Sequence, residues 1–125
     1  MRICVVYNIC GISGRDNSEY YIKAIGSILA QDYEDKFVVV SACRSSPETI
    51  DELKRAFGDM ISINAIDTIV PVNVTFNSTC REVALKDKEC HFLYVDSGCG
   101  FQTTDVISRM VARLESERLG MISTN

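Results

Sequence analysis

The sequence predicts an α/β fold, with a mostly parallel sheet and helices on both of its faces. Short runs of strand-forming residues, such as Phe37 to Val40, alternate with longer segments whose apolar residues recur at helical spacing. Each helical segment is long enough to connect two parallel strands, whereas antiparallel strands need only a short turn. We therefore expect strand–helix–strand units that share one sheet.

Size and composition support a single domain over residues 1–125. Hydrophobic residues make up 46% of the chain and charged residues 24%, proportions unlike those of a disordered protein. A chain of this length buries roughly two-thirds of the surface that its unfolded form exposes. That is enough for a hydrophobic core.

Charge and hydropathy exclude several classes of function. The net charge is -4 and the 13 lysines and arginines are scattered, so no basic face is offered to nucleic acid. No apolar stretch reaches the roughly 18 residues of a membrane span, and no export signal is recognisable, so we expect a cytoplasmic protein. In that compartment cysteines stay reduced, and the six here are Cys4, Cys10, Cys43, Cys80, Cys90 and Cys99.

The first part of the chain predicts two strands with a helix between them. A strand over Ile3 to Tyr7 is followed by a glycine-containing loop over Asn8 to Asn17. Ser18 is a suitable N-cap for a helix from Glu19 to Gln31. The second strand covers Phe37 to Ala42.

The middle of the chain continues the alternation. Ser46 and Pro47 begin a second helix, which ends before Gly58. A short third strand covers Ile61 to Ile63, and a loop then runs to about Thr75. The third helix is outlined by the apolar positions Phe76, Cys80, Val83 and Ala84.

The last part predicts one more strand and helix. The fourth strand covers His91 to Val95 and ends at Asp96. Thr104 is the expected N-cap of a helix that Gly120 closes, and Met121 to Ser123 begins a fifth strand as the chain stops. The apolar face of this helix consists of Ile107, Met110, Val111 and Leu114.

Three loops are the places to look for a ligand. Parallel sheets bind ligands beyond the carboxyl ends of their strands, which here means the loops after Tyr7, Val40 and Val95. The glycines between Gly11 and Gly14 do not form the G-x-G-x-x-G pattern, so the sequence suggests a dinucleotide cofactor only weakly.

The segment from Tyr21 to Ser41 resembles a known family. Its run Ser27 to Tyr33 (SILAQDY), followed by Val38 to Val40, is similar to the early part of family 2 glycosyltransferases. The resemblance implies the Rossmann-like GT-A fold of nucleotide-diphospho-sugar transferases. It also implies inverting transfer of a sugar from a nucleotide diphosphate sugar, most often a UDP-sugar, with Mn or Mg as the cation.

Asp96 is the candidate metal ligand. It ends a strand and is followed by Gly98 and Gly100, which let a backbone approach a ligand closely. The resemblance implies that an Asp-x-Asp motif and a cation neutralise the diphosphate here, although Gly98 stands where the second Asp is usual. A cation held by one carboxylate is compatible with this sequence, and so is a simple turn cap at Asp96.

The resemblance implies further nucleotide contacts in the first two loops. Tyr7 offers a ring for stacking and Asn8 an amide for hydrogen bonds to the base. After the second strand, Ser41 and Arg44 stand where the family usually has aspartates. Ser41 could bind the base, and Arg44 could either face a phosphate or pair with an aspartate elsewhere in the chain.

Two residues of the third helix complete the candidate site. Asn77 best matches a family asparagine that faces the diphosphate near a helix start, and Arg81 lies one turn later. A polar helix face in water is an equally good interpretation of Arg81.

Two other functional classes stay open. The missing aspartates favour a non-catalytic nucleotide-binding module, and a Rossmann-type oxidoreductase is the second alternative. In the resembled family the catalytic base lies beyond the matched segment, so we expect this chain to bind a nucleotide sugar but to transfer it poorly. The acceptor, a glycan or a protein, is not identified by the sequence. Dimerisation or a further polypeptide could cover the exposed edge of a truncated sheet.

Overall fold

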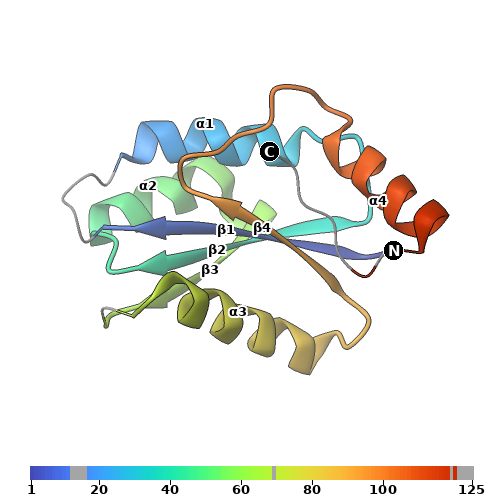
Figure 1. Cartoon of the computed structure of the whole chain (residues 1–125). Helices are drawn as coiled ribbons and strands as arrows, with labels where there is room; N and C mark the ends of the chain where they lie inside the picture. Colours follow the sequence, from blue (N-terminus) through green and yellow to red (C-terminus); the bar gives the residue numbers. More distant parts are fainter. Residues whose placement is uncertain (12–16, 69, 119, 121–125) are drawn as a thin grey trace.

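A computed structural model describes residues 1–11, 17–68, 70–118 and 120. Within them, a parallel sheet is flanked by α-helices on both faces, which confirms the predicted fold class (Figure 1). The elements in chain order are β1 (Ile3–Cys10), α1 (Ser18–Leu29), β2 (Lys36–Cys43), α2 (Pro47–Phe57), the short 3-10 helix η1 (Gly58–Met60), β3 (Ile61–Ile66), α3 (Val72–Lys86), β4 (His91–Asp96) and α4 (Val106–Glu117).

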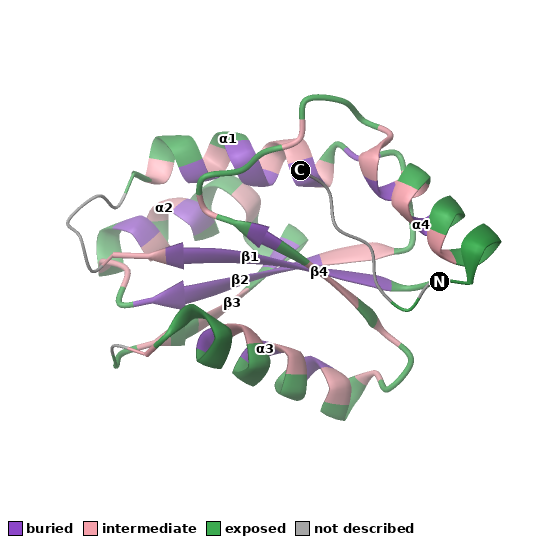
Figure 2. Ribbon diagram, in the orientation of Figure 1, coloured by how far each residue is buried: buried purple, intermediate pink, exposed green. Residues whose placement is uncertain are grey.

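The sheet has the strand order β3-β2-β1-β4, so β1 lies in its interior. Val5 and Tyr7 of β1 belong to a core cluster with residues of α1, α2 and α4, whereas Cys4 and Val6 pack with Val83 of α3. Helix α3 accordingly lies on the opposite face of the sheet from α1 and α2 in Figure 1. Figure 2 shows β1 and β2 as largely buried strands, as expected for parallel strands covered on both sides.

Two boundaries of the first unit differ from the sequence prediction. Strand β1 continues to Cys10, so Asn8 belongs to the strand and not to the loop. Asn17, not Ser18, caps α1, because its Oδ1 accepts the Tyr20 N–H at 3.1 Å. Ser18 instead donates a hydrogen bond to Glu52 of α2.

Helix α3 begins earlier than predicted. It starts at Val72, after Pro71, whereas the apolar pattern placed its start near Phe76. The reason is that its first inward positions are polar: Thr75 and Thr79 are buried against the sheet. Strand β3 is also longer than predicted and extends to Ile66.

The start of α4 is held by a residue far away in the sequence. Thr104 makes no cap, and Gln31 serves instead: its Oε1 accepts the Ile107 N–H at 3.1 Å and its Nε2 donates to the Thr103 carbonyl at 2.6 Å. Gln31 is only 4% exposed. The helix ends at Glu117 and is followed by Arg118, whose backbone is in the left-handed conformation. The predicted fifth strand lies outside the described residues.

None of the helices in the described part of the chain is long and apolar enough to cross a bilayer.

Replacing Gln31 should destabilise the fold. Gln31→Ala leaves the buried Ile107 N–H and the Thr103 carbonyl without their partner, and we expect the free energy of unfolding to fall by about 2 kcal/mol or more. Urea unfolding measures the change. The exposed Gln102 supplies the matched control, since Gln102→Ala should change stability by less than about 0.5 kcal/mol. Equal losses in the two variants would contradict this role of Gln31.

Candidate functional site

Polar side chains form a row across the carboxyl ends of all the strands of the sheet. Asn8 of β1 is paired in register with Ser41 of β2 on one side and with Asp96 of β4 on the other. Ser41 is in turn paired with Asn64 of β3. Paired residues of parallel strands point to the same face, which here is the face that α3 covers. The row therefore brings together three of the predicted site residues.

The half of the row on β2 and β3 forms hydrogen bonds to α3. The Thr79 hydroxyl lies 3.1 Å from the Ser41 hydroxyl, and the Asn64 amide donates to Thr79 Oγ1 at 3.0 Å. Ser41 is fully buried and Thr79 nearly so. Ser41 is therefore a structural link between β2 and α3 in this conformation, and its predicted contact with a base stays a prediction.

The other half of the row holds an unsatisfied polar atom. Asn8 is 5% exposed, and its Oδ1 has no hydrogen-bond partner within the described part of the chain. Outside the row, the buried hydroxyl of Ser45, which follows β2, also has no hydrogen-bond partner among the described residues. Buried polar atoms are nearly always hydrogen-bonded, so an unpaired one calls for an explanation such as a ligand. Both atoms lie at the edge where parallel sheets bind ligands.

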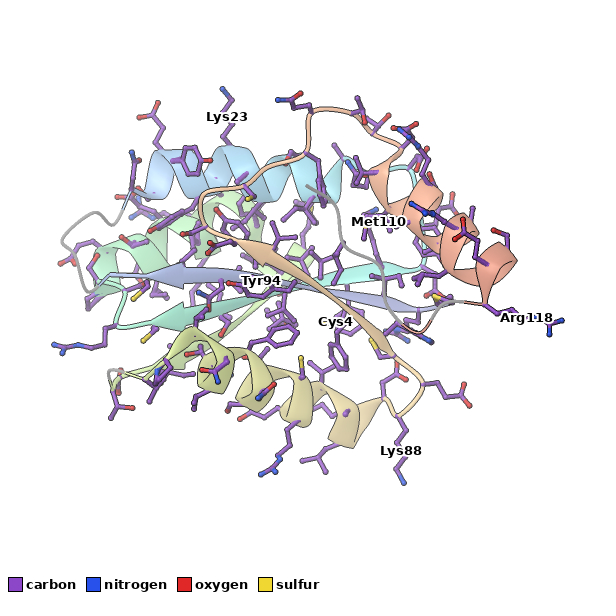
Figure 3. The ribbon with its side chains drawn as sticks, viewed as in Figure 1. Cys4, Lys23, Lys88, Tyr94, Met110 and Arg118 are labelled. Carbon is purple, nitrogen blue, oxygen red and sulfur yellow. The ribbon has the colours of Figure 1, made fainter. Side chains whose placement is uncertain are left out.

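Asp96 lies at the exposed end of the row. Its Oδ1 accepts the Ser97 N–H at 2.8 Å and the Tyr94 hydroxyl at 3.4 Å. Tyr94, labelled in Figure 3, packs edge-to-face on Phe76 of α3 with ring centroids 5.2 Å apart. Burial, and secondly the charge of Asp96, raise the pKa of Tyr94, so its hydroxyl keeps its proton and donates.

Two tyrosines hold the loop that follows Asp96. The Tyr7 hydroxyl donates to the Ser97 carbonyl at 3.0 Å, and the Tyr20 hydroxyl donates to the Gly98 carbonyl at 3.0 Å. The ring of Tyr7 is fully buried and packs against Tyr21, on the face opposite the polar row. Tyr7 therefore positions the loop from within the core, and its predicted stacking on a base stays a prediction.

The loops after β1 and β2 touch each other closely. Arg44 has a left-handed backbone with φ 51°, which is costly for a residue with a Cβ. A Cβ added at Gly11 would clash with the Arg44 carbonyl oxygen, so only glycine fits there. The exposed side chain of Arg44 thus stands at the rim of the row on a strained backbone.

Gly98 has a different environment. A Cβ at this position would meet nothing within 4 Å, and its φ lies outside the left-handed region. No close backbone approach to the rest of the protein requires a glycine here. The loop would accommodate the aspartate that the resembled family has at this place.

Asn77 and Arg81 do not join the row. Both are exposed on α3, and Asn77 is in the second turn of the helix and not at its start. They stand about half a turn away from Thr75 and Thr79, which face the sheet. Their predicted contacts with a diphosphate stay predictions.

Sequence reasoning missed three residues of the site: Asn64, Thr79 and Tyr20. The spacing of Thr75 and Thr79, four residues apart, was the available signal for a polar face of α3 directed at the sheet.

The described residues offer few ligands for a metal ion. They contain no group of three or more His, Cys, Asp or Glu side chains that could hold a metal ion. Asp96 supplies an exposed carboxylate, and Mg²⁺ is commonly bound by one or two carboxylates with water and substrate phosphates. A cation shared with a diphosphate is compatible with this donor set.

Comparisons with known proteins concern the fold. No protein-family model matches the chain. No curated protein matches it either. Among solved structures, S. aureus TarS matches 100% of this chain and 23% of its own, at TM-score 0.64 and 19% identity. Residues 1–349 of TarS match with TM-score 0.66 at 19% identity, again over 100% of this chain and over 38% of theirs.

A third solved structure is a Desulfovibrio desulfuricans G20 protein assigned as a nucleotide-diphospho-sugar transferase. It matches 92% of this chain and 55% of its own, with TM-score 0.60 and 8% identity. Because these identities are low, the likeness shows the fold alone: a glycosyltransferase-like α/β fold, as predicted. The chain spans less than two-thirds of each of these proteins.

Removing the Tyr20 hydroxyl should loosen the loop after β4. Tyr20→Phe deletes the hydrogen bond to Gly98, which is worth about 1 kcal/mol, so amide exchange in the peptide 97–101 should accelerate roughly fivefold. Hydrogen-exchange mass spectrometry measures this. Tyr33→Phe is the control, since the Tyr33 hydroxyl donates to Met1 away from the loop. Unchanged exchange in Tyr20→Phe would show that this bond does not hold the loop.

Proposed function

We propose that the polar row binds a nucleotide diphosphate sugar, and that the chain is the donor-binding part of a glycosyltransferase. The observation that carries this proposal is the pair of unsatisfied buried atoms, Asn8 Oδ1 and Ser45 Oγ, at the carboxyl edge of the sheet. Supporting it are the fold shared with a nucleotide-diphospho-sugar transferase and the resemblance to family 2. A narrower likeness, to the N-terminal glycosyltransferase domain of a large algal virus protein, stays a prediction.

The side chains suggest an order of contacts along such a donor. Asn8 suits a nucleobase edge, because its amide offers both donor and acceptor atoms from a buried position. The guanidinium of Arg44 suits a phosphate at the rim. We propose a uridine nucleotide as the ligand.

Asp96 would hold the cation. Mn or Mg, when bound, would neutralise charge on the diphosphate leaving group. The hydrogen bonds from Tyr94 and from the Ser97 N–H orient the Asp96 carboxylate through Oδ1. Tyr7 and Tyr20 hold the backbone that follows it.

Transfer needs a base for the acceptor hydroxyl. Asp105 is engaged by the Thr103 hydroxyl at 2.7 Å and by Arg109 at 3.9 Å, while Glu115 is exposed on α4. Neither lies in the row. We therefore propose that the 125-residue chain binds the donor and transfers its sugar poorly by itself. A non-catalytic binding module is the second candidate, favoured by Gly98 in place of a carboxylate.

A calorimetric titration with two ligands, a nucleotide sugar and a dinucleotide, tests the proposed function. Wild-type protein should bind uridine diphosphate glucose in the presence of manganese and should not bind NAD, as measured by calorimetry. Asn8→Ala should weaken binding on the order of tenfold, about 1.4 kcal/mol. Its stability should change little, since removing an unpaired buried acceptor also removes its desolvation cost of about 1–3 kcal/mol.

Three results would each count against a part of this proposal. Tight binding of NAD without measurable binding of the uridine nucleotide would favour the Rossmann-type oxidoreductase. Full affinity in folded Asn8→Ala would show that the unsatisfied amide has no part in binding. Robust multiple-turnover transfer by the isolated chain would place the base within these residues.

The contribution of the cation is tested at Asp96. Asp96→Asn should weaken manganese-dependent binding of uridine diphosphate on the order of tenfold or more, because the variant loses the charge that faces the metal. Gly98→Asp should act in the opposite direction, since the open space beside Gly98 admits a second carboxylate. Asp59→Asn, far from the row in η1, is the matched control. Equal affinities in all of these proteins would exclude Asp96 as the metal ligand.

A further inference from the structure

The ends of β1 and β2 bring two cysteines side by side. Cys10 and Cys43 are the last residues of their strands and are direct partners in the parallel register. Paired residues of parallel strands point to the same face, and neighbouring strands lie about 4.8 Å apart. In disulfides the Cα atoms are about 4.4–6.8 Å apart. The backbone therefore already holds this pair within the range of a disulfide.

The position of Cys10 at the end of β1 also allows the two cysteines to approach to disulfide distance. A disulfide needs its Cβ atoms about 3.8 Å apart, roughly 1 Å closer than the strand spacing. Cys10 is followed by the loop that begins at Gly11, so its end of the pairing is not fixed by further strand. The Gly11 N–H donates to the Cys43 carbonyl at 3.0 Å, which keeps the two strand ends together.

The two thiols differ in access. Cys10 is partly exposed, whereas Cys43 is 3% exposed and its Sγ lies 3.4 Å from the Thr68 carbonyl. A reagent would therefore reach Cys10 first, and Cys43 would be the resolving partner beneath it.

The cysteines between the sheet and α3 provide a contrast. Burial raises the pKa of Cys4 to about 12 and that of Cys80 to about 11. Figure 3 shows Cys4 inside this layer. Because the thiolate is the reactive form, these thiols should be inert at neutral pH.

We propose that Cys10 and Cys43 are a redox-active dithiol, which a small disulfide such as oxidised glutathione converts to an intramolecular disulfide. The Cys10 thiolate, its proton lost to water, attacks one sulfur of the small disulfide and expels one thiolate. The Cys43 thiolate then attacks the Cys10 sulfur of the mixed disulfide and expels the second. Both leaving thiolates take up protons, so two cysteines are oxidised while one small disulfide becomes two thiols.

This assignment does not rest on the proposed nucleotide function. It follows from the register of β1 and β2, and it would hold for any ligand of the sheet edge. The pair lies two residues beyond Asn8 and Ser41 on the same face, so the linkage would join the strand ends directly above the polar row.

Peptide mapping of wild-type protein tests the proposal. The protein is treated with oxidised glutathione, the remaining thiols are blocked, and trypsin is added without reduction. We expect the peptide 3–15 to be joined to the peptide 37–44, with the mass of two hydrogen atoms lost. The linkage should be absent from Cys10→Ser and Cys43→Ser, should form normally in Cys80→Ser, and should disappear on reduction.

Peptide 3–15 also contains Cys4, so the Cys10→Ser variant identifies which thiol is joined. A mixed disulfide that persists on Cys10 of wild-type protein would overturn the proposal. So would a linkage of peptide 37–44 that survives in folded Cys10→Ser. Fragmentation of the linked wild-type peptide between Cys4 and Cys10 gives the same assignment, so a variant that failed to fold would leave the test intact.

Discussion

The register of β1 between its two neighbours is the constraint on which the rest of the structure depends. Every residue from Ile3 to Cys10 is paired with β2, and Ile3 to Asn8 are paired with β4 as well. A slip by one residue would turn Tyr7 toward α3 and Asn8 into the core beside α1. The apolar positions of β1 prevent such a slip, because both faces of the strand are buried.

The same register divides the polar row into two halves with different roles. Toward β3, Ser41 and Asn64 are bound to Thr79, so these groups stabilise the packing of α3 on the sheet. Toward β4, Asn8 has an oxygen without a partner among the described residues, and Asp96 has an exposed carboxylate. A fold gains nothing in stability from an unpaired buried acceptor. The proposed function places its ligand at this half of the row, while the first half stabilises the fold.

Much of the fold could be predicted from the sequence, because the strands and helices carry strong apolar periodicity. The start of α2 at Ser46 and Pro47 and the extent of β4 agree with local signals. Two of the misses have a common physical cause: polar groups whose partners are distant in sequence. Gln31 caps the start of α4 in place of Thr104 by such a contact. The buried Thr75 and Thr79 interrupt the apolar pattern over the first turns of α3, so the start of this helix could not be predicted from that pattern.

The candidate site was predictable to the extent that it depends on strand ends. Asn8, Ser41 and Asp96 could be placed at one edge, because carboxyl ends of parallel strands converge there. Asn77 and Arg81 could not be placed correctly, since their position depends on where α3 begins and on which side faces the sheet. The solvent-side position of both residues follows from the buried threonines.

The anchoring of the loop after β4 bears on the missing second carboxylate. Tyr7 and Tyr20 bind backbone carbonyls of this loop, and Asp96 binds the Ser97 N–H, so the side chain at position 98 takes no part in holding it. The identity of residue 98 can therefore change without moving Asp96. If the proposed cation binds at Asp96, Gly98 would lower the number of charges that face it and would leave the position of the Asp96 carboxylate unchanged. The proposed difference from the resembled family is then one of cation affinity and not of the place where the cation binds.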